Sequence, residues 1–524
     1  MRRRTDADHE SARFVTRTAL GAILLAAAAL RLSHLGRDSA WVDEVLSISF
    51  SNGSLIEIAR KLKAQQLPLY FWVNSFFQAY SVAEGWLRLP SALYGIALVP
   101  VVFLIGAEIG RSRTGLTAAA LAAVSHYLIS HSQEIRQYAL MVLLSLVGTW
   151  AVTRFRRDPG RITWTVLGIA SLLNLYTSPF AAFIVAIHWA AVAALAWRER
   201  RRQLLGYALL VAVLYVPAVA HMWPMLSGSA SIVHYSDDDY RHFLPLVTTS
   251  LVNFAGWIPT LAVLLAAGSV AGAAVLWRRC RVFVLIALAS FVVPVASLYI
   301  KTPGHFFDPR YLIYALPHLL LLTATAIVRL WDRATKRFAW PTLDTIGPAA
   351  VGVAVVYTVT LMTPHYELLG RTPDWRGAAR AILAGLHDGD CIAVKPFFDT
   401  NTVLYQLDQL AGAGRRVQVT PESENSWYRQ YHRNRRVAEH PEDFRGPTIT
   451  MTAITDLAQL DDLPSVAGTI WLITDELPAS HRDEFAPVMT LGPVDAAGMS
   501  VSDIPSPILY RRVRHSADRA ARSH

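Results

Sequence analysis

Residues 257–300, WIPTLAVLLAAGSVAGAAVLWRRCRVFVLIALASFVVPVASLYI, contain the pattern that decides the fold. Two apolar runs, 257–277 and 282–300, flank the basic cluster Arg278-Arg279-Cys280-Arg281. A helix rises about 1.5 Å per residue, so about 20 apolar residues cross a hydrocarbon core about 30 Å thick. This stretch therefore predicts two membrane-spanning helices joined by a short, positively charged turn.

The same pattern recurs along most of the chain and predicts about eleven transmembrane helices. The expected spans are 16–34, 88–109, 114–131, 137–154, 162–177, 179–197, 204–222, 257–277, 282–300, 311–330 and 345–363. The first span could instead be a cleaved signal peptide. No small-residue cleavage site followed by a soluble domain is evident, so we expect an uncleaved helix.

The composition agrees with a membrane protein. Of 524 residues, 53% are hydrophobic and 17% are charged, against about 25% charged in soluble proteins. The net charge of +10 is a common feature of nucleic-acid-binding proteins. Here the basic residues lie in short clusters between apolar runs, as the positive-inside rule expects. We therefore predict membrane lipids, and no nucleic acid, as the surroundings of the chain.

Six basic clusters fall at every second loop and predict the orientation in the membrane. We assign their side to the cytoplasm, so the chain would be a multi-pass plasma-membrane protein with a cytoplasmic N-terminus. The clusters are Arg2 to Arg4, Arg111 with Arg113, Arg154 to Arg157, Arg198 to Arg202, Arg278 to Arg281 and Arg329 to Arg337. The other loops carry acidic groups, among them the run 237–239. The two cysteines, Cys280 and Cys391, would lie on opposite sides and could not form a disulfide.

The composition changes at about Pro364, where apolar runs shorten to strand length. We predict three parts: a transmembrane domain over 1–363, an extracytoplasmic α/β domain over 364–514, and a disordered tail over 515–524. In the α/β domain, a helix is expected over 374–386 with Asp374 as its N-cap. Strands are expected at 391–394, 416–419, 469–474 and 508–513.

The first outer loop, 35–87, contains Trp41-Val42-Asp43-Glu44. Two adjacent carboxylates just past a span could belong to an ordinary solvated loop. Trp41 and the apolar residues 45–48 would instead hold them near the membrane surface. A base placed there could take a proton from an acceptor hydroxyl. Farther along, residues 67–72 are typical of an interfacial helix with aromatic anchors.

Two further outer loops carry charged residues. The second loop, 131–138, places Glu134 and Arg136 at a span end, where charges are costly unless paired or wet. A structural salt bridge and a group beside a reaction centre both fit this pattern. The third loop, 301–311, gathers Lys301, His305 and Arg310 on the side that is otherwise acidic. It could contact lipid headgroups, or its cations could stabilise a leaving phosphate.

Taken in order, these motifs resemble the integral membrane glycosyltransferases that include the protein O-mannosyltransferases and the bacterial lipid A aminoarabinose transferase. The resemblance covers roughly residues 15–330 and implies a GT-C fold. It rests on five pieces, namely Trp41 to Glu44, Pro68-Leu69-Tyr70, Leu87 to Gly95, Ser132 to Leu140 and Arg310-Tyr311-Leu312.

The resemblance implies an inverting enzyme that moves a sugar from a polyprenyl-phosphate donor to an acceptor on the outer face. Mannose or arabinose is a plausible sugar, and the acceptor could be a glycan, a lipid or a protein. Asp43 would be the general base, with Glu44 and Glu134 shaping the site. The expected donor phosphate contacts are Arg136, Arg310, Tyr311, Lys301 and His305, and the expected cavity residues are Trp41, Tyr70, Arg88 and Tyr138.

Two departures from the family pattern each remove an imidazole. Gln66-Leu67-Pro68 stands where many relatives have His-Pro-Pro, and Tyr176-Thr177-Ser178 stands where relatives often have Tyr-Thr-His. A histidine-based metal site is therefore in doubt. The carboxylates could hold Mg²⁺ or Mn²⁺, but nothing in the sequence requires a cofactor. A transporter or flippase, or a non-catalytic scaffold, are the alternative functions. A transporter would need an internal repeat and mid-membrane charges, which the sequence does not show.

Overall fold

The structure is a computed structural model. It describes residues 2–33, 35–62, 66–227, 242–301, 308–335, 341–362, 373–387, 389–395, 399–411, 417–419, 449–453, 469–475, 477, 479–491 and 507–512. The acidic run 237–239, His305 and the predicted tail 515–524 lie outside the described residues.

The chain divides into two compact units. The first comprises Met1–Leu35, Gly53–Phe77 and Leu87–Thr363. The second comprises Pro364–His524 together with two pieces of the first loop, Gly36–Asn52 and Gln78–Trp86. Residues of the first loop therefore occur in both units, and the predicted domain bounds stay a prediction.

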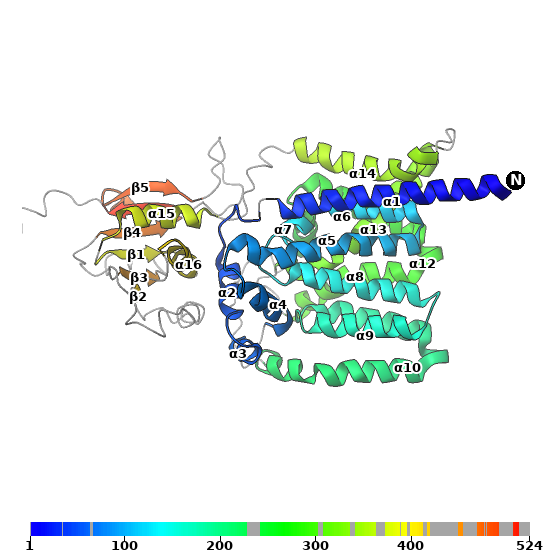
Figure 1. Ribbon diagram of the computed structural model, residues 1–524, viewed down its shortest axis with the longest axis horizontal. Coiled ribbons are helices and arrows are strands. Elements are labelled where there is room, and N and C mark those ends of the chain that lie inside the picture. Colours follow the sequence, from blue (N-terminus) through cyan, green and yellow to red (C-terminus); the bar gives the residue numbers. More distant parts are fainter. Residues whose placement is uncertain are drawn as a thin grey trace, which may run out of the picture. The chain divides into compact units, whose positions relative to one another are not determined.

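The first unit is a bundle of helices that lie side by side (Figure 1). Its elements are α1 (Arg2–Leu32), α3 (Leu55–Lys61), α4 (Pro68–Gln78), α5 (Glu84–Ile109), α6 (Ser112–Val124), α7 (His126–Ser130), α8 (Tyr138–Phe155), α9 (Arg161–Leu175), α10 (Ala181–Leu226), α11 (Phe243–Phe254), α12 (Pro259–Lys301), the 3₁₀ helix η2 (Pro309–Ala315), α13 (Leu316–Ala334) and α14 (Pro341–Met362).

Seven helices among the described residues are long and apolar enough to cross a membrane. Two of them, α10 and α12, are each broken by one residue with non-helical dihedral angles, Arg200 and Cys280. Each break lies within a predicted basic turn, between two predicted spans. The chain is thus a polytopic helical membrane protein as predicted, while the number of eleven spans stays a prediction.

The helix α13, which follows the third loop, packs closely against α12. A Cβ atom on Gly272 would lie 1.8 Å from the Leu322 carbonyl oxygen, so only glycine fits there. Gly268 faces Thr323 one turn away, which gives the GxxxG spacing common at membrane helix interfaces. Between them, the Ser269 hydroxyl donates to the Leu319 carbonyl at 3.2 Å.

A buried polar network joins α8, α10 and α13. Thr149 Oγ1 lies 2.8 Å from Nε2 of both His188 and His318, and the three residues are at most 1% exposed. His318 Nδ1 lies 2.8 Å from the Tyr314 carbonyl oxygen and must donate to it. His318 Nε2 then accepts from the Thr149 hydroxyl, and the hydroxyl oxygen accepts from His188. The Thr149 hydroxyl, which also lies 3.1 Å from the Ser145 carbonyl oxygen, therefore links the two imidazoles.

One arginine ties α1 to the end of α6. The Arg31 guanidinium is 0% exposed and donates to the carbonyl oxygens of Ala122 and Ala123, both at 2.9 Å. These carbonyls belong to the last turn of α6, where the helix dipole favours a cation. A buried cation at a span end is thus paired with backbone rather than with a carboxylate.

The second unit is built on one mixed sheet of six strands. The strands are β1 (Cys391–Val394), β2 (Val417–Val419), β3 (Ile449–Ala453), β4 (Ile470–Thr474), β5 (Phe485–Thr490) and β6 (Ile508–Arg512), in the order β2-β3-β1-β4-β6-β5. The first four pair in parallel, and β6 pairs antiparallel with β4 and β5. The helices are α2 (Val42–Phe50), α15 (Trp375–Gly385) and α16 (Thr400–Ala411), with the short 3₁₀ helix η7 (Ala479–His481).

Most elements predicted for this unit are present. The four predicted strands correspond to β1, β2, β4 and β6, and the predicted helix is α15. The Asp374 carboxylate caps α15 by accepting from the Gly377 N–H at 2.8 Å. The sequence analysis missed β3, β5 and α16. The α/β class is therefore confirmed, with two more strands and one more helix than predicted.

Two aspartates lie together beyond the carboxyl ends of β1 and β4. These neighbouring strands run in parallel, so the residues that follow them, Asp399 and Asp475, meet at one sheet edge. Burial, and then the charge of Asp475, raise the pKa of Asp399 from 3.8 to about 7.

The raised pKa of Asp399 predicts how stability depends on pH. Between about pH 4 and 7, the folded unit keeps a proton that the unfolded chain has lost, so stability falls as the pH rises through this window. Asp399→Asn should remove this loss and raise the apparent unfolding midpoint at about pH 8, with little effect near pH 4. Protease sensitivity of the second unit during heating measures the midpoint. The exposed Asp483→Asn is the control, and an unaltered pH dependence in Asp399→Asn would contradict the assignment.

The Arg31 contacts generate a second prediction. Arg31→Met leaves two buried carbonyls without donors, at a cost of about 1–3 kcal/mol each, and should lower the apparent thermal midpoint in detergent by several degrees. Arg17→Met is the matched control, because Arg17 is exposed on the same helix. Equal midpoints for the two variants, measured at one heating rate, would show that Arg31 contributes nothing.

Candidate active site

The second loop is fixed to the end of α1 by one amide. Gln133 Nε2 donates to three carbonyl oxygens, of Leu30, Arg31 and Ser33, at 2.9–3.1 Å. The Ser132 hydroxyl bonds the Leu128 carbonyl behind it. These hydrogen bonds attach the backbone of the second loop, which carries the charged residues 134 and 136, to neighbouring helices.

Aromatic rings and cations gather around Tyr138, the first residue of α8. The guanidinium carbons of Arg136 and Arg310 lie 5.6 and 5.8 Å from the centre of its ring. The His131 ring packs edge-on against the rings of Tyr127 and Tyr138. The second and third loops, which are far apart in sequence, thus meet at one tyrosine.

Acidic groups are interleaved with these cations. Asp308 Oδ2 lies 2.6 Å from Arg310 Nε, and its Oδ1 accepts the Arg310 N–H at 2.9 Å. Glu134 Oε2 lies 3.0 Å from His131 Nδ1. The side chains of Asp308 and Arg310 are 21% and 17% exposed, so the ion pair is largely shielded from solvent but still accessible to a ligand. The ion pair with Asp308 orients the Arg310 guanidinium, whose planar fork of donors suits recognition of an oxyanion.

The Pro68-Leu69-Tyr70 piece joins the same cluster through backbone and hydroxyl contacts. The Tyr70 hydroxyl lies 3.3 Å from Ser91 Oγ, and Ser91 donates to the Arg136 carbonyl at 3.2 Å. The Leu69 N–H donates to the Tyr176 carbonyl at 3.1 Å. Tyr70 is fully buried, so this piece contacts the Arg136 backbone from the interior of the first unit, through Ser91.

Two more predicted residues of the first unit have defined partners. Tyr311 stacks on Phe180 with ring centres 4.4 Å apart and planes 3° from parallel. Arg88 is 4% exposed and donates to the Leu35 carbonyl at 2.8 Å. That contact holds the backbone where the first loop begins.

Trp41, Asp43 and Glu44 belong to the second unit, at the start of α2. Glu44 is 1% exposed, and its Oε2 accepts the Trp41 N–H at 3.4 Å, so it closes the first turn of the helix. Asp43 is partly exposed in that turn, and its carbonyl accepts from Ser47 Oγ at 2.9 Å. The carboxylate that is a candidate base thus lies on an ordered helix.

The predicted residues therefore separate into two groups. Glu134, Arg136, Tyr138, Arg310 and Tyr70 come together in the first unit, which also contains Tyr311 and Arg88, whereas Trp41, Asp43 and Glu44 lie in the second. Lys301 ends α12, and nothing further is described of its side chain. Among the described residues, no group of three His, Cys, Asp or Glu side chains could hold a metal ion. The roles of all these residues remain predictions.

Several residues of the cluster were not singled out from the sequence. Gln133, His131 and Phe180 lack any distinctive pattern, since an amide, an imidazole and an aromatic ring at span ends are common. Arg31 carried a usable signal, because an arginine in the last turn of a predicted span must find a partner. Asp308 was not singled out either, although it caps the 3₁₀ helix η2 and precedes Pro309, which is a common start signal for a helical turn.

No family model matches the chain, and no curated protein does. Among solved structures, the chain is similar to apo ArnT from Cupriavidus metallidurans, with a TM-score of 0.57 and 13% identity over 94% of this chain and 97% of the other. ArnT from the same organism bound to undecaprenyl phosphate gives a TM-score of 0.53 and 14% identity over 95% and 97%. At these identities the likeness establishes the fold, and the predicted GT-C fold is confirmed.

Proposed function

We propose that this protein is an inverting glycosyltransferase that moves a sugar from a polyprenyl-phosphate donor to an acceptor on the outer face of the membrane. The observation that carries the proposal is the convergence of Arg136 and Arg310 on Tyr138, within the fold of ArnT. A hydrophobic carrier also explains why such an enzyme would be polytopic, since the tail can stay in lipid while the phosphate reaches the loops.

A phosphate suits the Tyr138 cluster on electrostatic grounds. Arg136 is 8% exposed, and a charge-assisted hydrogen bond from a guanidinium to a phosphate is stronger in such a poorly solvated place than in water. The ArnT structure with undecaprenyl phosphate has the same overall fold. We infer that Arg136 and Arg310 contact the donor phosphate, with Tyr311, Lys301 and His305 beside it.

The proposed step needs one base and one stabilised leaving group. The acceptor hydroxyl attacks the anomeric carbon, Asp43 takes the hydroxyl proton, and the bond from that carbon to the phosphate oxygen breaks. The departing polyprenyl phosphate gains negative charge, which the two guanidinium groups stabilise. Attack opposite the leaving group inverts the anomeric centre, and the proton ends on the Asp43 carboxylate.

The other predicted residues complete this site in supporting roles. Glu44 maintains the first turn of α2, and Glu134 orients His131 beside Tyr138. Trp41, Tyr70, Arg88 and Tyr138 would line or support the cavity for donor and acceptor. A divalent ion, Mg²⁺ or Mn²⁺, would need oxygen ligands, which the carboxylates of this loop could supply.

Loss of the base gives the first functional prediction. Purified protein should transfer label from a radiolabelled polyprenyl-phosphate sugar, and Asp43→Asn should reduce transfer about 10²–10⁴-fold with normal expression and unfolding midpoint. Glu57→Gln is the control, because Glu57 is an exposed carboxylate of the same loop. Full activity in Asp43→Asn would remove Asp43 as the base, and absence of transfer by the unmodified protein with every donor would refute the proposed function.

Loss of a phosphate contact gives the second functional prediction. Arg310→Ala should weaken binding of the polyprenyl-phosphate sugar roughly 10- to 100-fold, since a hydrogen bond to a charged group contributes about 1.5–3 kcal/mol. Arg310→Lys should be intermediate, because ammonium keeps the charge but loses the fork of donors. Donor affinity is measured by equilibrium binding, with the exposed Arg161→Ala as control. Unchanged affinity in Arg310→Ala would show that the phosphate binds elsewhere.

A further inference from the structure

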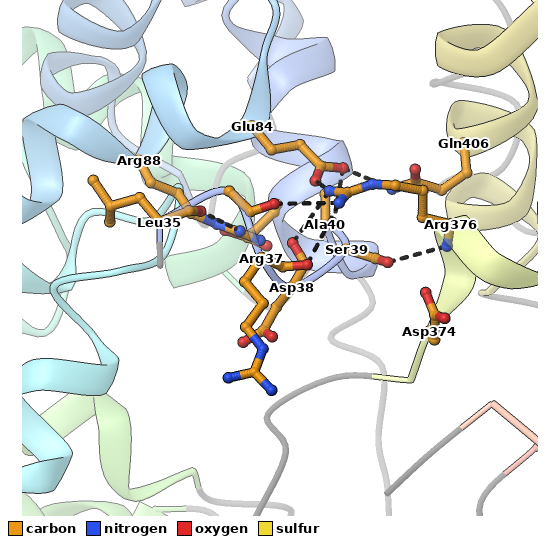
Figure 2. Close-up of polar contacts among 12 residues, drawn as sticks. Leu35, Arg37, Asp38, Ser39, Ala40, Glu84, Arg88, Asp374, Arg376 and Gln406 are labelled. Atoms are coloured by element: carbon orange, nitrogen blue, oxygen red, sulfur yellow. Dashed lines mark hydrogen bonds and ion pairs between the residues drawn. The ribbon is translucent and has the colours of Figure 1, made fainter. Parts of the chain in front are cut away.

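One side chain of α15 holds the backbone that leads into α2. Arg376 Nη1 donates to the carbonyl oxygens of Gly36 and Arg37 at 3.2 and 3.4 Å, and its Nη2 reaches the Asp38 carbonyl at 3.5 Å. Its own N–H donates to Ser39 Oγ at 3.0 Å. Four consecutive residues of the first loop are thus bound by one arginine (Figure 2).

A buried carboxylate completes this arrangement. Glu84 Oε1 accepts from the Ala40 N–H at 3.0 Å and from Gln406 Nε2 at 2.7 Å, and its Oε2 bonds Arg376 (Figure 2). The Glu84 side chain is 7% exposed, and that of Arg376 is 24% exposed. Burying a charge is costly unless it is paired and hydrogen-bonded, and here the carboxylate has an ion pair with Arg376 and hydrogen bonds from Ala40 and Gln406. We call Glu84, Arg376 and Gln406 the loop clamp.

The clamp determines where α2 begins. It binds residues 36–40, and the next residue, Trp41, opens α2 through its contact with Glu44. α2 then packs against α16, the helix that contributes Gln406, and its residues 44–50 are all buried. Because residues 36–40 lead directly into α2, the contacts of the clamp bear on the orientation of its first turn and of Asp43 within that turn.

We propose that Arg376, through Glu84 and Gln406, is a positioning residue that fixes the orientation of the Asp43 carboxylate. The catalytic consequence of this inference rests on the proposed function. The contacts of the clamp are independent of that function. The second unit would then be a structural support for the base. It would not act only as a cover or as an acceptor-binding module.

The clamp is separate from what holds the second unit together. The sheet has its own core, in which Cys391, Ala393, Ile470, Leu472 and Phe485 are at most 5% exposed. Asp390 ties β1 to β4 by accepting from the Thr469 N–H and from Trp471 Nε1. Loss of Arg376 is therefore expected to loosen residues 36–50 before it unfolds the sheet.

Amide hydrogen exchange of the full-length protein in nanodiscs tests this without any substrate. Arg376→Gln should speed exchange at residues 39–50 by about 10-fold or more, while the strands β1 and β4 stay protected. Arg380→Gln is the matched control, because Arg380 is an exposed arginine one turn along the same helix. Unchanged exchange at 39–50 in Arg376→Gln would overturn the inference.

A milder variant covers the case in which Arg376→Gln also exposes the strands. Arg376→Lys keeps the charge beside Glu84 but cannot reach all the carbonyl oxygens at once. It should accelerate exchange at 39–50 alone. If the loop and the strands change equally in this variant, or neither changes, the clamp does not position the loop.

Kinetics then connect the clamp to catalysis. In Arg376→Gln, kcat should fall roughly 10- to 100-fold, as expected for a small misplacement of a reacting group. The donor KM should stay within about threefold, and the acid limb of the kcat/KM pH profile should shift; a mere loss of folded protein would leave that limb in place. An unchanged kcat would refute the positioning role. If exchange responds but the unmodified protein transfers no sugar, the proposed function fails while the clamp stands.

Discussion

Two arginines close to one tyrosine ring form the constraint on which the rest of the account depends. Arg136 and Arg310 lie within 6 Å of the Tyr138 ring, at helix ends where water is scarce and charges are costly. Asp308 orients one guanidinium, and the contacts of Gln133 with the backbone at the end of α1 hold the loop that carries the other. If a phosphate binds these groups as proposed, little rearrangement would be needed on binding.

The first loop connects this constraint to the second unit. Its Pro68-Leu69-Tyr70 piece supports Arg136 inside the helical unit, whereas the Trp41–Glu44 piece is built onto α15 and α16 by the loop clamp. The candidate phosphate contacts and the candidate base therefore belong to different compact units. In such a transferase, a folded domain would fix the position of the base. A base on a solvated loop would instead be mobile.

The features that could be predicted from the sequence are those that depend on repeated local patterns of residues. Apolar runs of span length, basic turns at Arg200 and Cys280, the Asp374 cap and the strand Cys391–Val394 all follow from period, length and capping rules. Contacts between distant segments could not be predicted that way. Nothing local distinguishes Gln133 or Arg376 from other polar residues, and the His188–Thr149–His318 network exists only because three helices meet. Glu84 was overlooked because a single glutamate before a span looks like an ordinary helix start.

The most direct test is a cryo-EM map of the protein in nanodiscs with undecaprenyl phosphate. Phosphate density within hydrogen-bonding distance of the Arg136 and Arg310 guanidiniums, with the Asp43 carboxylate facing the same cavity, is what the account predicts. Phosphate bound away from Tyr138, or Asp43 on the other side of the bilayer, would contradict it.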